Sequence, residues 1–169
     1  MHPISWFILL VLLLWFLWTY GRWFAGVKDG APFVPISKRH LQDGMELLPL
    51  TKDDVVIDLG SGSGTILREV ARRGARGIGY EFHPLLVAWS TYFLKKFRDQ
   101  IQIHRGDLFE ADISQATVVT MFGLSTMQRK MDKMLREKAR PGTRVLVFLA
   151  PELSLKVIAK KGWATLYEV

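Results

Sequence analysis

The sequence contains no cysteine among its 169 residues. Disulfide frameworks, thiolate zinc sites and cysteine nucleophiles are therefore excluded. Only four histidines are present, and they lie far apart along the chain, so a histidine-based metal site is not expected either. We predict chemistry that uses no resident metal.

Acidic residues are fewer than basic ones, 16 against 23, which gives a formal net charge of +7. A basic excess suits nucleic acid, an anionic lipid surface or an acidic partner, and by itself it does not choose among them. Hydrophobic residues make up 49% of the chain and charged residues 23%. This balance is typical of a globular protein, and the length is sufficient for one domain with its own core.

Charge is absent from the first part of the chain, where no charged residue precedes Arg22. Residues 4–20 read ISWFILLVLLLWFLWTY, and at ~1.5 Å per residue they would extend roughly 26 Å as a helix, close to the thickness of a bilayer's hydrocarbon core. Aromatic residues gather near both ends of the run, as they do at membrane interfaces. The pattern predicts a transmembrane anchor that contacts the lipid bilayer through residues 4–24.

A cleaved signal peptide and a buried or interfacial helix are the alternatives for this segment. A signal peptide has a basic start and small residues before its cleavage site, whereas Met1–Ser5 contains no Lys or Arg and the run ends in bulky aromatics. Basic residues follow the run and none precedes it. The positive-inside bias then predicts a single-pass protein whose catalytic domain lies on the cytoplasmic side of a prokaryotic inner membrane, or in an organelle membrane.

Three regions are expected: the anchor over residues 1–24, a linker and pre-motif over 25–36, and a catalytic domain over 37–169. Within the domain, strand patterns alternate with helical patterns. The predicted strands are 55–59, 77–82, 101–104, 117–122 and 144–149, and the predicted helices are 65–73, 84–98 and 125–140. This alternation predicts an α/β fold, Rossmann-like, with a parallel sheet, helices on both of its faces and a short C-terminal hairpin over Leu155–Val169.

The stretch DLGSGSG, residues 58–64, joins the first predicted strand to a helix. A phosphate loop would need a Lys that is absent, and a dinucleotide fingerprint would need Gly at the position of Thr65. Two further acidic residues follow later strands, Glu81 after the second and Asp107 after the third. Glycines allow a ligand to approach the backbone, and a carboxylate after strand two can accept both hydroxyls of a ribose.

This arrangement resembles the S-adenosylmethionine site of class I methyltransferases. The resemblance implies S-adenosyl-L-methionine as the cofactor, with Asp58 organising the loop and holding the α-ammonium group, Glu81 holding the ribose and Asp107 reaching the adenine. The implied cofactor-binding residues are Asp58, Gly60, Ser61, Gly62, Gly64, Glu81, Phe82, Asp107 and Leu108.

A narrower resemblance covers roughly residues 30–150. The order APFVP, DLGSGSG, GYE, GDL and VVTMFGLSTM is similar to the membrane-anchored lysine methyltransferases of the ATP synthase c subunit and the adenine nucleotide translocase, and to their prokaryotic relatives. It implies N-methylation of a lysine in a membrane protein. The family's Pro after the fourth strand is replaced by Ser125-Thr126. Position alone makes Phe33, Phe122 and Ser125 candidates near the methyl acceptor, and no general base is evident.

Other functions stay open at this point. The enzyme could methylate a lipid or quinone-like molecule, or the chain could be a catalytically silent scaffold that binds the cofactor; a nicotinamide oxidoreductase is the weakest alternative. Nucleic acid is not expected as a partner, because the fourth strand lacks the [DN]PP[YF] element and no aromatic platform is evident. The sequence leaves the oligomeric state open.

Overall fold

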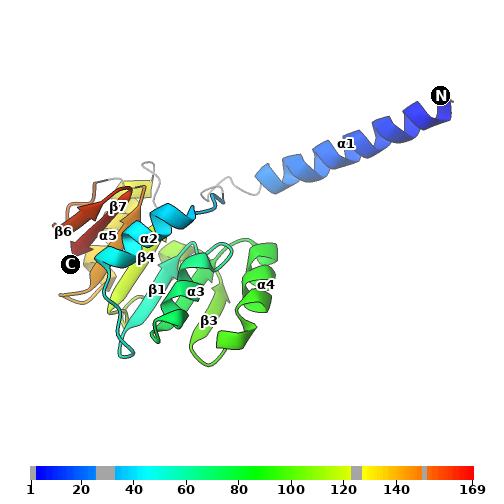
Figure 1. The fold of residues 1–169 in the computed structure, drawn as a ribbon. Coiled ribbons are helices and arrows are strands. Elements are labelled where there is room, and N and C mark those ends of the chain that lie inside the picture. Colours follow the sequence, from blue (N-terminus) through cyan, green and yellow to red (C-terminus); the bar gives the residue numbers. More distant parts are fainter. Residues whose placement is uncertain (1–2, 26–32, 123–126, 150–151) are drawn as a thin grey trace. The chain divides into compact units, whose positions relative to one another are not determined.

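The computed structural model describes residues 3–25, 33–122, 127–149 and 152–169 (Figure 1). The chain forms two compact units, Met1–Val34 and Pro35–Val169. The finer division into a segment over 1–24, a linker over 25–36 and a catalytic domain over 37–169 remains a proposal.

The N-terminal unit contains helix α1, Pro3–Ala25. Across the described parts of the chain, no helix has both the length and the apolar character that a membrane span requires. The predicted transmembrane anchor over residues 4–24 is therefore wrong, and so is the single-pass membrane localisation with a cytoplasmic domain that depended on it.

The second unit is built on one seven-stranded sheet with the order β3-β2-β1-β4-β5-β7-β6 (Figure 1). Its strands are β1 Val55–Leu59, β2 Arg76–Glu81, β3 Ile101–Arg105, β4 Val118–Phe122, β5 Arg144–Phe148, β6 Lys156–Lys161 and β7 Ala164–Glu168. Strands β1 to β5 pair in parallel, whereas β7 runs antiparallel to both β5 and β6. The predicted Rossmann-like α/β sheet and its C-terminal hairpin are confirmed.

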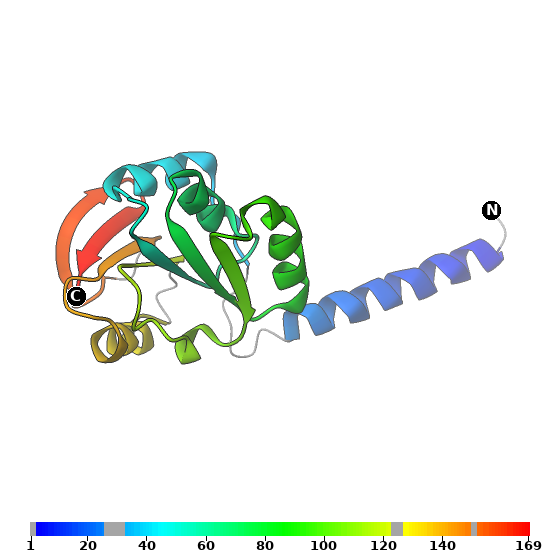
Figure 2. The same cartoon turned by 90° about the horizontal axis from the view of Figure 1, so that it is seen from below.

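Helices cover both faces of this sheet, as predicted (Figure 2). They are α2 Lys38–Leu47, α3 Thr65–Arg72, α4 Pro84–Phe93 and α5 Gln128–Lys138, with short 3-10 turns at η1 Lys95–Phe97 and η2 Leu108–Glu110. Met45 of α2 and Leu67 of α3 belong to the core on one face, and Met131 of α5 belongs to the core on the other.

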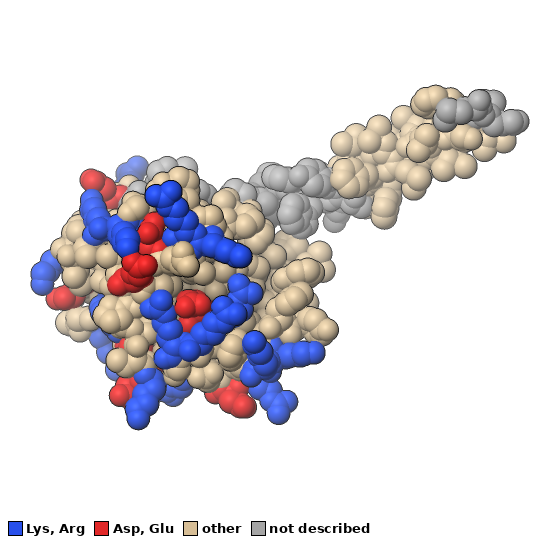
Figure 3. Space-filling model, in the orientation of Figure 1, with Lys and Arg blue, Asp and Glu red and all other residues tan. Residues whose placement is uncertain are grey.

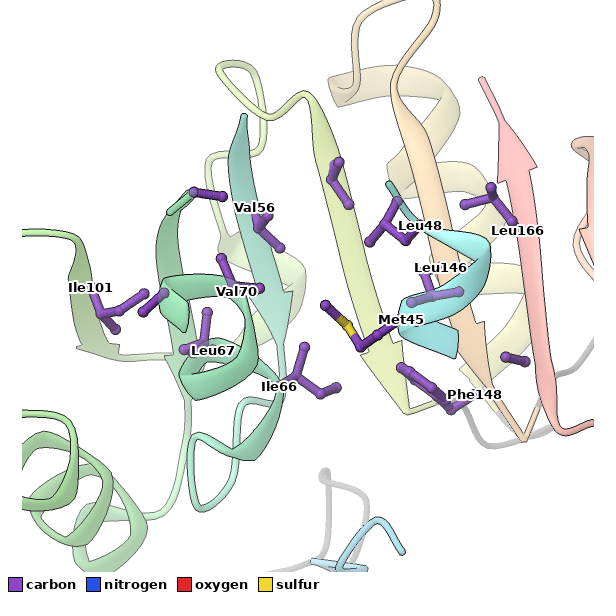
Figure 4. Close-up of a cluster of buried hydrophobic side chains, with 14 of the residues drawn as sticks. Met45, Leu48, Val56, Ile66, Leu67, Val70, Ile101, Leu146, Phe148 and Leu166 are labelled. Atoms are coloured by element: carbon purple, nitrogen blue, oxygen red, sulfur yellow. The ribbon is translucent and has the colours of Figure 1, made fainter. Parts of the chain in front are cut away.

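The core beneath α2 and α3 fixes their position on the sheet (Figure 4). Met45 and Leu48 pack with Leu146 and Phe148 there. A Cβ atom at Gly44 would lie 2.2 Å from Cε1 of Phe148, so only glycine allows α2 to approach β5 this closely.

Two predicted helices differ from the observed ones. The helix expected over 84–98 ends at Phe93, because Leu94 leaves the helical conformation and is buried, and the chain continues as η1. The helix expected over 125–140 is observed as α5, Gln128–Lys138, and residues 125–126 lie outside the described residues.

Candidate functional site

The glycine-rich loop between β1 and α3 forms a tight turn at the carboxyl end of the sheet. Gly60, Gly62 and Gly64 all have positive φ, at 77°, 53° and 74°, a conformation that disfavours side chains. The N–H groups of Gly60 and Ser61 both donate to the carbonyl of Tyr80 on β2, at 2.9 and 3.0 Å. The loop is therefore held against the second strand in a conformation that its glycines allow.

Glu81 ends β2 directly beside this loop and is 9% exposed. Its Oε2 accepts a hydrogen bond from the N–H of Gly62 at 2.8 Å, and its Oε1 accepts one from the N–H of His83 at 2.8 Å. Each carboxylate oxygen can accept further hydrogen bonds. The side chain is thus fixed in orientation, with acceptor capacity left for a pair of hydroxyl groups.

Asp58 lies on β1, one strand away, and is 2% exposed. Its Oδ1 accepts a hydrogen bond from Oγ1 of Thr120 on β4 at 2.7 Å. Burial raises the pKa of Asp58 to about 7; the Thr120 hydroxyl lowers it and the charge of Glu81 raises it further. Two acidic side chains without a basic partner in the described structure make this end of the sheet attractive to a cationic group.

Ser61 adds an unsatisfied polar atom to the loop. Its side chain is 6% exposed, and its Oγ is buried without a hydrogen-bond partner among the described residues. A Cβ atom at Gly79 would lie 2.6 Å from this oxygen, so the neighbouring strand leaves room only for the serine. Because an orphaned buried hydroxyl is costly, the loop fits a ligand with polar atoms.

The end of the third strand meets the same region. The N–H of Gly106 donates to the carbonyl of Glu81 at 3.1 Å, and a Cβ atom at Gly60 would lie 3.8 Å from Cδ2 of Leu108. Asp107 is exposed. Its Oδ1 accepts a hydrogen bond from the N–H of Phe109 at 2.9 Å, and this bond caps the start of η2. Leu108 therefore lies against the glycine loop, while Asp107 stands at its rim.

The other residues predicted for the cofactor site or the methyl acceptor are Phe82, Phe122, Phe33 and Ser125. Phe82 follows Glu81 with 62% of its surface exposed. Phe122 ends β4 and packs, half-buried, against the core on the α2 and α3 face. Phe33 belongs to the N-terminal unit and is exposed, and Ser125 lies outside the described residues.

Sequence reasoning missed Thr120. The only signal in the sequence is a hydroxyl residue inside the apolar strand VVTMF. Its role depends on the register that sets Asp58 opposite Thr120, and this register is visible only once β1 and β4 are paired.

Comparison with known proteins agrees with this geometry. The model of the ANTKMT methyltransferase domain matches residues 58–151. A protein-lysine N-methyltransferase of Saccharolobus islandicus is 32% identical over 119 residues, which are 68% of this chain and 74% of that protein. The human lysine N-methyltransferase of the ATP synthase c subunit is 29% identical over 124 residues, 71% of this chain and 52% of its own length. The chain thus spans about half the length of its human relative.

Solved structures are similar as well. An RNA methyltransferase from Salinibacter ruber, in complex with S-adenosyl-L-homocysteine, has 37% sequence identity and a TM-score of 0.67, covering 80% of this chain and 92% of its own. A SAM-dependent methyltransferase from Geobacter sulfurreducens with the same ligand has 23% identity and a TM-score of 0.59, covering 75% and 56% of the two chains, and shows the fold alone. The predicted cofactor is confirmed, and the glycine loop and buried carboxylates fit it. The matching family model covers more than half of the 169 residues and includes Asp58, Glu81 and Asp107, so this chain belongs to the ANTKMT methyltransferase family and is an S-adenosylmethionine-dependent methyltransferase.

Proposed function

We propose that this enzyme methylates the ε-amino group of a lysine in a protein. The observation that carries the proposal is the similarity to the protein-lysine N-methyltransferase of S. islandicus, which covers more than two thirds of both chains. The human and rat relatives are named for the c subunit of ATP synthase. A membrane protein as the acceptor is the narrower form of the proposal, and it requires no anchor in this chain.

The cofactor-binding roles are part of the proposal. Glu81 accepts hydrogen bonds from the ribose hydroxyls, a role supported by its two fixed oxygens. Asp58 receives the α-ammonium group, a role supported by its burial beside a second carboxylate. The backbone of the loop lies along the methionine portion, formed by Gly60, Ser61, Gly62 and Gly64. Phe82, Asp107 and Leu108 surround the adenine.

The bound cofactor supplies a methyl group on a sulfonium, which is already activated for displacement. The protein's task is to align the nucleophile and to exclude water. An amine must be neutral to attack, and at a reference pKa of about 10.4 only a few lysines in ten thousand are neutral at pH 7. Apolar surroundings lower that pKa. We assign this desolvation to Phe122 at the end of β4, with Phe33 and Ser125 as further candidates near the acceptor.

RNA methylation is the second candidate function. The S. ruber protein is named an RNA methyltransferase, and this chain carries a net charge of +7. Lys and Arg are spread over the face of the domain drawn in Figure 3. The β4 sequence VVTMF lacks the [DN]PP[YF] element that many methyltransferases use to hold a planar base, and this disfavours RNA.

One labelling experiment separates these functions. The purified chain is incubated with methyl-labelled S-adenosylmethionine and with the protein, RNA and lipid fractions of cells that lack it, and Glu81→Ala serves as the inactive control. We expect label in protein, recovered as methyl-lysine after acid hydrolysis. Label in RNA would support the second candidate, and label confined to the organic extract, or none, would contradict both.

A further inference from the structure

We propose that Thr120 is a positioning residue for the cofactor. Its hydroxyl favours the ionised form of Asp58 without completing the ionisation, and it orients the carboxylate to receive the α-ammonium group. Cofactor binding then displaces the proton that Asp58 still carries in part of the free protein. This inference rests on the proposed role of Asp58 and extends the site to β4, a strand that supplied none of the predicted cofactor contacts.

The geometry places the two side chains face to face inside the sheet. Thr120 and Asp58 are direct register partners on β4 and β1, they are 0% and 2% exposed, and Oγ1 lies 2.7 Å from Oδ1. A β-branched threonine has a restricted χ1 angle, so its hydroxyl is held in place by the strand. Thr120 therefore restricts the orientation of the Asp58 carboxylate through Oδ1, and Oδ2 has no hydrogen-bond donor among the described residues.

Within the described parts of the chain, the charged groups near Asp58 either oppose its ionisation or do not interact with it. Side chains alternate along β1, and Val56 belongs to the core on the α3 face, so Asp58 points to that face too. From β2 comes the carboxylate of Glu81, whereas β4 contributes no charged residue. On α3, Glu69 pairs with Arg72 and Arg73, and Arg68 is exposed.

These surroundings make cofactor binding pH-dependent. Burial raises the pKa of Asp58 to about 7, so a large fraction of the free protein carries this proton at neutral pH. An ammonium group favours the ionised carboxylate. Binding therefore converts the Asp58 carboxylic acid to a carboxylate paired with the ligand, and the proton passes to solvent. Affinity rises with pH up to the pKa and is level above it.

S-adenosyl-L-homocysteine is the probe, because it keeps the amino group and undergoes no turnover. Its affinity is measured by calorimetry at pH 6, 7 and 8 in buffers of different ionisation enthalpy, which reports the protons released. For the natural protein we expect about a tenfold gain in affinity from pH 6 to pH 8 and the release of about half a proton at pH 7.

Two variants of Thr120 and one matched control complete the test. In Thr120→Val, Asp58 loses the hydrogen bond that lowers its pKa, so the rise in affinity moves to higher pH and binding at pH 7 weakens. Thr120→Ser keeps the hydroxyl and restores the natural profile. The control is Thr117→Val, which removes the hydroxyl that bonds Asp54 instead and leaves the profile unchanged.

The outcomes distinguish the inference from the proposed function. If the natural protein binds with an affinity that does not change from pH 6 to pH 8, the proposed function stands and the inference is wrong. The inference is also wrong if Thr120→Val keeps the natural profile or if Thr120→Ser fails to restore it. Absence of any binding by the natural protein would contradict the cofactor site itself, and the inference with it.

Discussion

Two buried aspartates, Asp54 and Asp58, stand at opposite ends of β1 and differ in what surrounds them. Each accepts a hydrogen bond from a threonine of the β4 segment, Asp54 from Thr117 at 2.6 Å and Asp58 from Thr120 at 2.7 Å. Asp54 also pairs with the guanidinium of Arg144 at 2.6 Å, whereas Asp58 faces the carboxylate of Glu81.

The difference appears in the two pKa values. Burial would raise the pKa of Asp54, but hydrogen bonds from Thr117 and Thr51 and the charge of Arg144 outweigh it, and the pKa falls below its ordinary value. Burial raises the pKa of Asp58 to about 7. Among the residues that the structure describes, the fold supplies a cation to the first carboxylate and none to the second. We infer that the amino end of β1 serves stability and its carboxyl end serves a cationic ligand.

The largest effect is expected on cofactor affinity, when Glu81 is removed from beside Asp58 at the carboxyl end of the sheet. Glu81→Ala deletes the carboxylate proposed to accept hydrogen bonds from two ribose hydroxyl groups. Hydrogen bonds to a charged group contribute about 1.5–3 kcal/mol each, so affinity for S-adenosylhomocysteine should fall at least roughly 100-fold. Calorimetry measures this loss, and circular dichroism checks that the domain stays folded. Glu69→Ala on α3 is the control; equal affinity of the two variants would show that the site is misplaced.

The next effect concerns stability at the other end of the strand. Asp54→Ala removes the carboxylate that pairs with Arg144 and accepts from the N–H of Thr51. Arg144 keeps its hydrogen bond to the carbonyl of Pro49 but loses the compensating charge, and we expect a loss of about 2–4 kcal/mol in the free energy of unfolding at pH 7. The native pKa of Asp54 is lowered, so its contribution is present above its unfolded pKa and disappears as the pH falls through the native value. The deficit should therefore shrink toward pH 3.

Urea denaturation at both pH values measures the deficit in Asp54→Ala, with the exposed neighbour Asp53→Ala as the control. Cofactor affinity at a temperature where the variant is folded should be unchanged. A large loss of affinity would mean that the two ends of β1 are not functionally distinct.

The sequence alone predicts the acidic residues at the carboxyl end of β1 and β2. Asp58 and Glu81 each follow a run of strand-forming residues, so strand periodicity together with the glycine loop places both at the carboxyl edge. The contact of Asp58 with β4 and the contact of Asp54 with β5 could not be predicted, because Thr120 lies 62 positions from Asp58 and Arg144 lies 90 positions from Asp54. Such contacts depend on the order and register of the strands, which local patterns do not determine.

The errors have local causes. The composition of residues 4–24 predicts a transmembrane anchor, but no helix among the described residues meets the combined length and apolar requirements of a span. The helix over 84–98 was extended past Phe93 because helical spacing continues in the sequence, while burial of Leu94 beside the glycine loop turns the chain. Tertiary packing overrides local periodicity there.

Asp58→Asn is expected to change the free energy of unfolding less than Asp54→Ala does, and to raise it instead of lowering it. A raised native pKa means that Asp58 favours folding fully only below its unfolded pKa of about 3.9, and this contribution is lost as the pH rises through about 7. At pH 8 the native protein holds a buried charge that asparagine lacks. The variant should be more stable at pH 8 by about 1–2 kcal/mol, and no more stable at pH 4.

Thermal unfolding at pH 4 and pH 8 measures the stability of Asp58→Asn, and calorimetry should show weaker binding of S-adenosylhomocysteine. A variant that is less stable at pH 8 would mean that Asp58 has a cationic partner, as Asp54 does, and the contrast between the two would fail.

The smallest effect is expected for Thr117→Val. Its hydroxyl donates to Asp54 and accepts from the N–H of Val55 at 3.0 Å, so its loss should cost about 1 kcal/mol of stability. Arg144 still compensates the charge of Asp54, so the loss should be similar from pH 6 to pH 8, and the binding profile should match the natural protein. Thr120→Val removes the same kind of bond, threonine to aspartate, further along the β4 segment, but it should shift the pH profile of binding. If both valines shift it equally, the two carboxylates are not tuned separately, and the division of β1 into a structural end and a ligand-binding end is wrong.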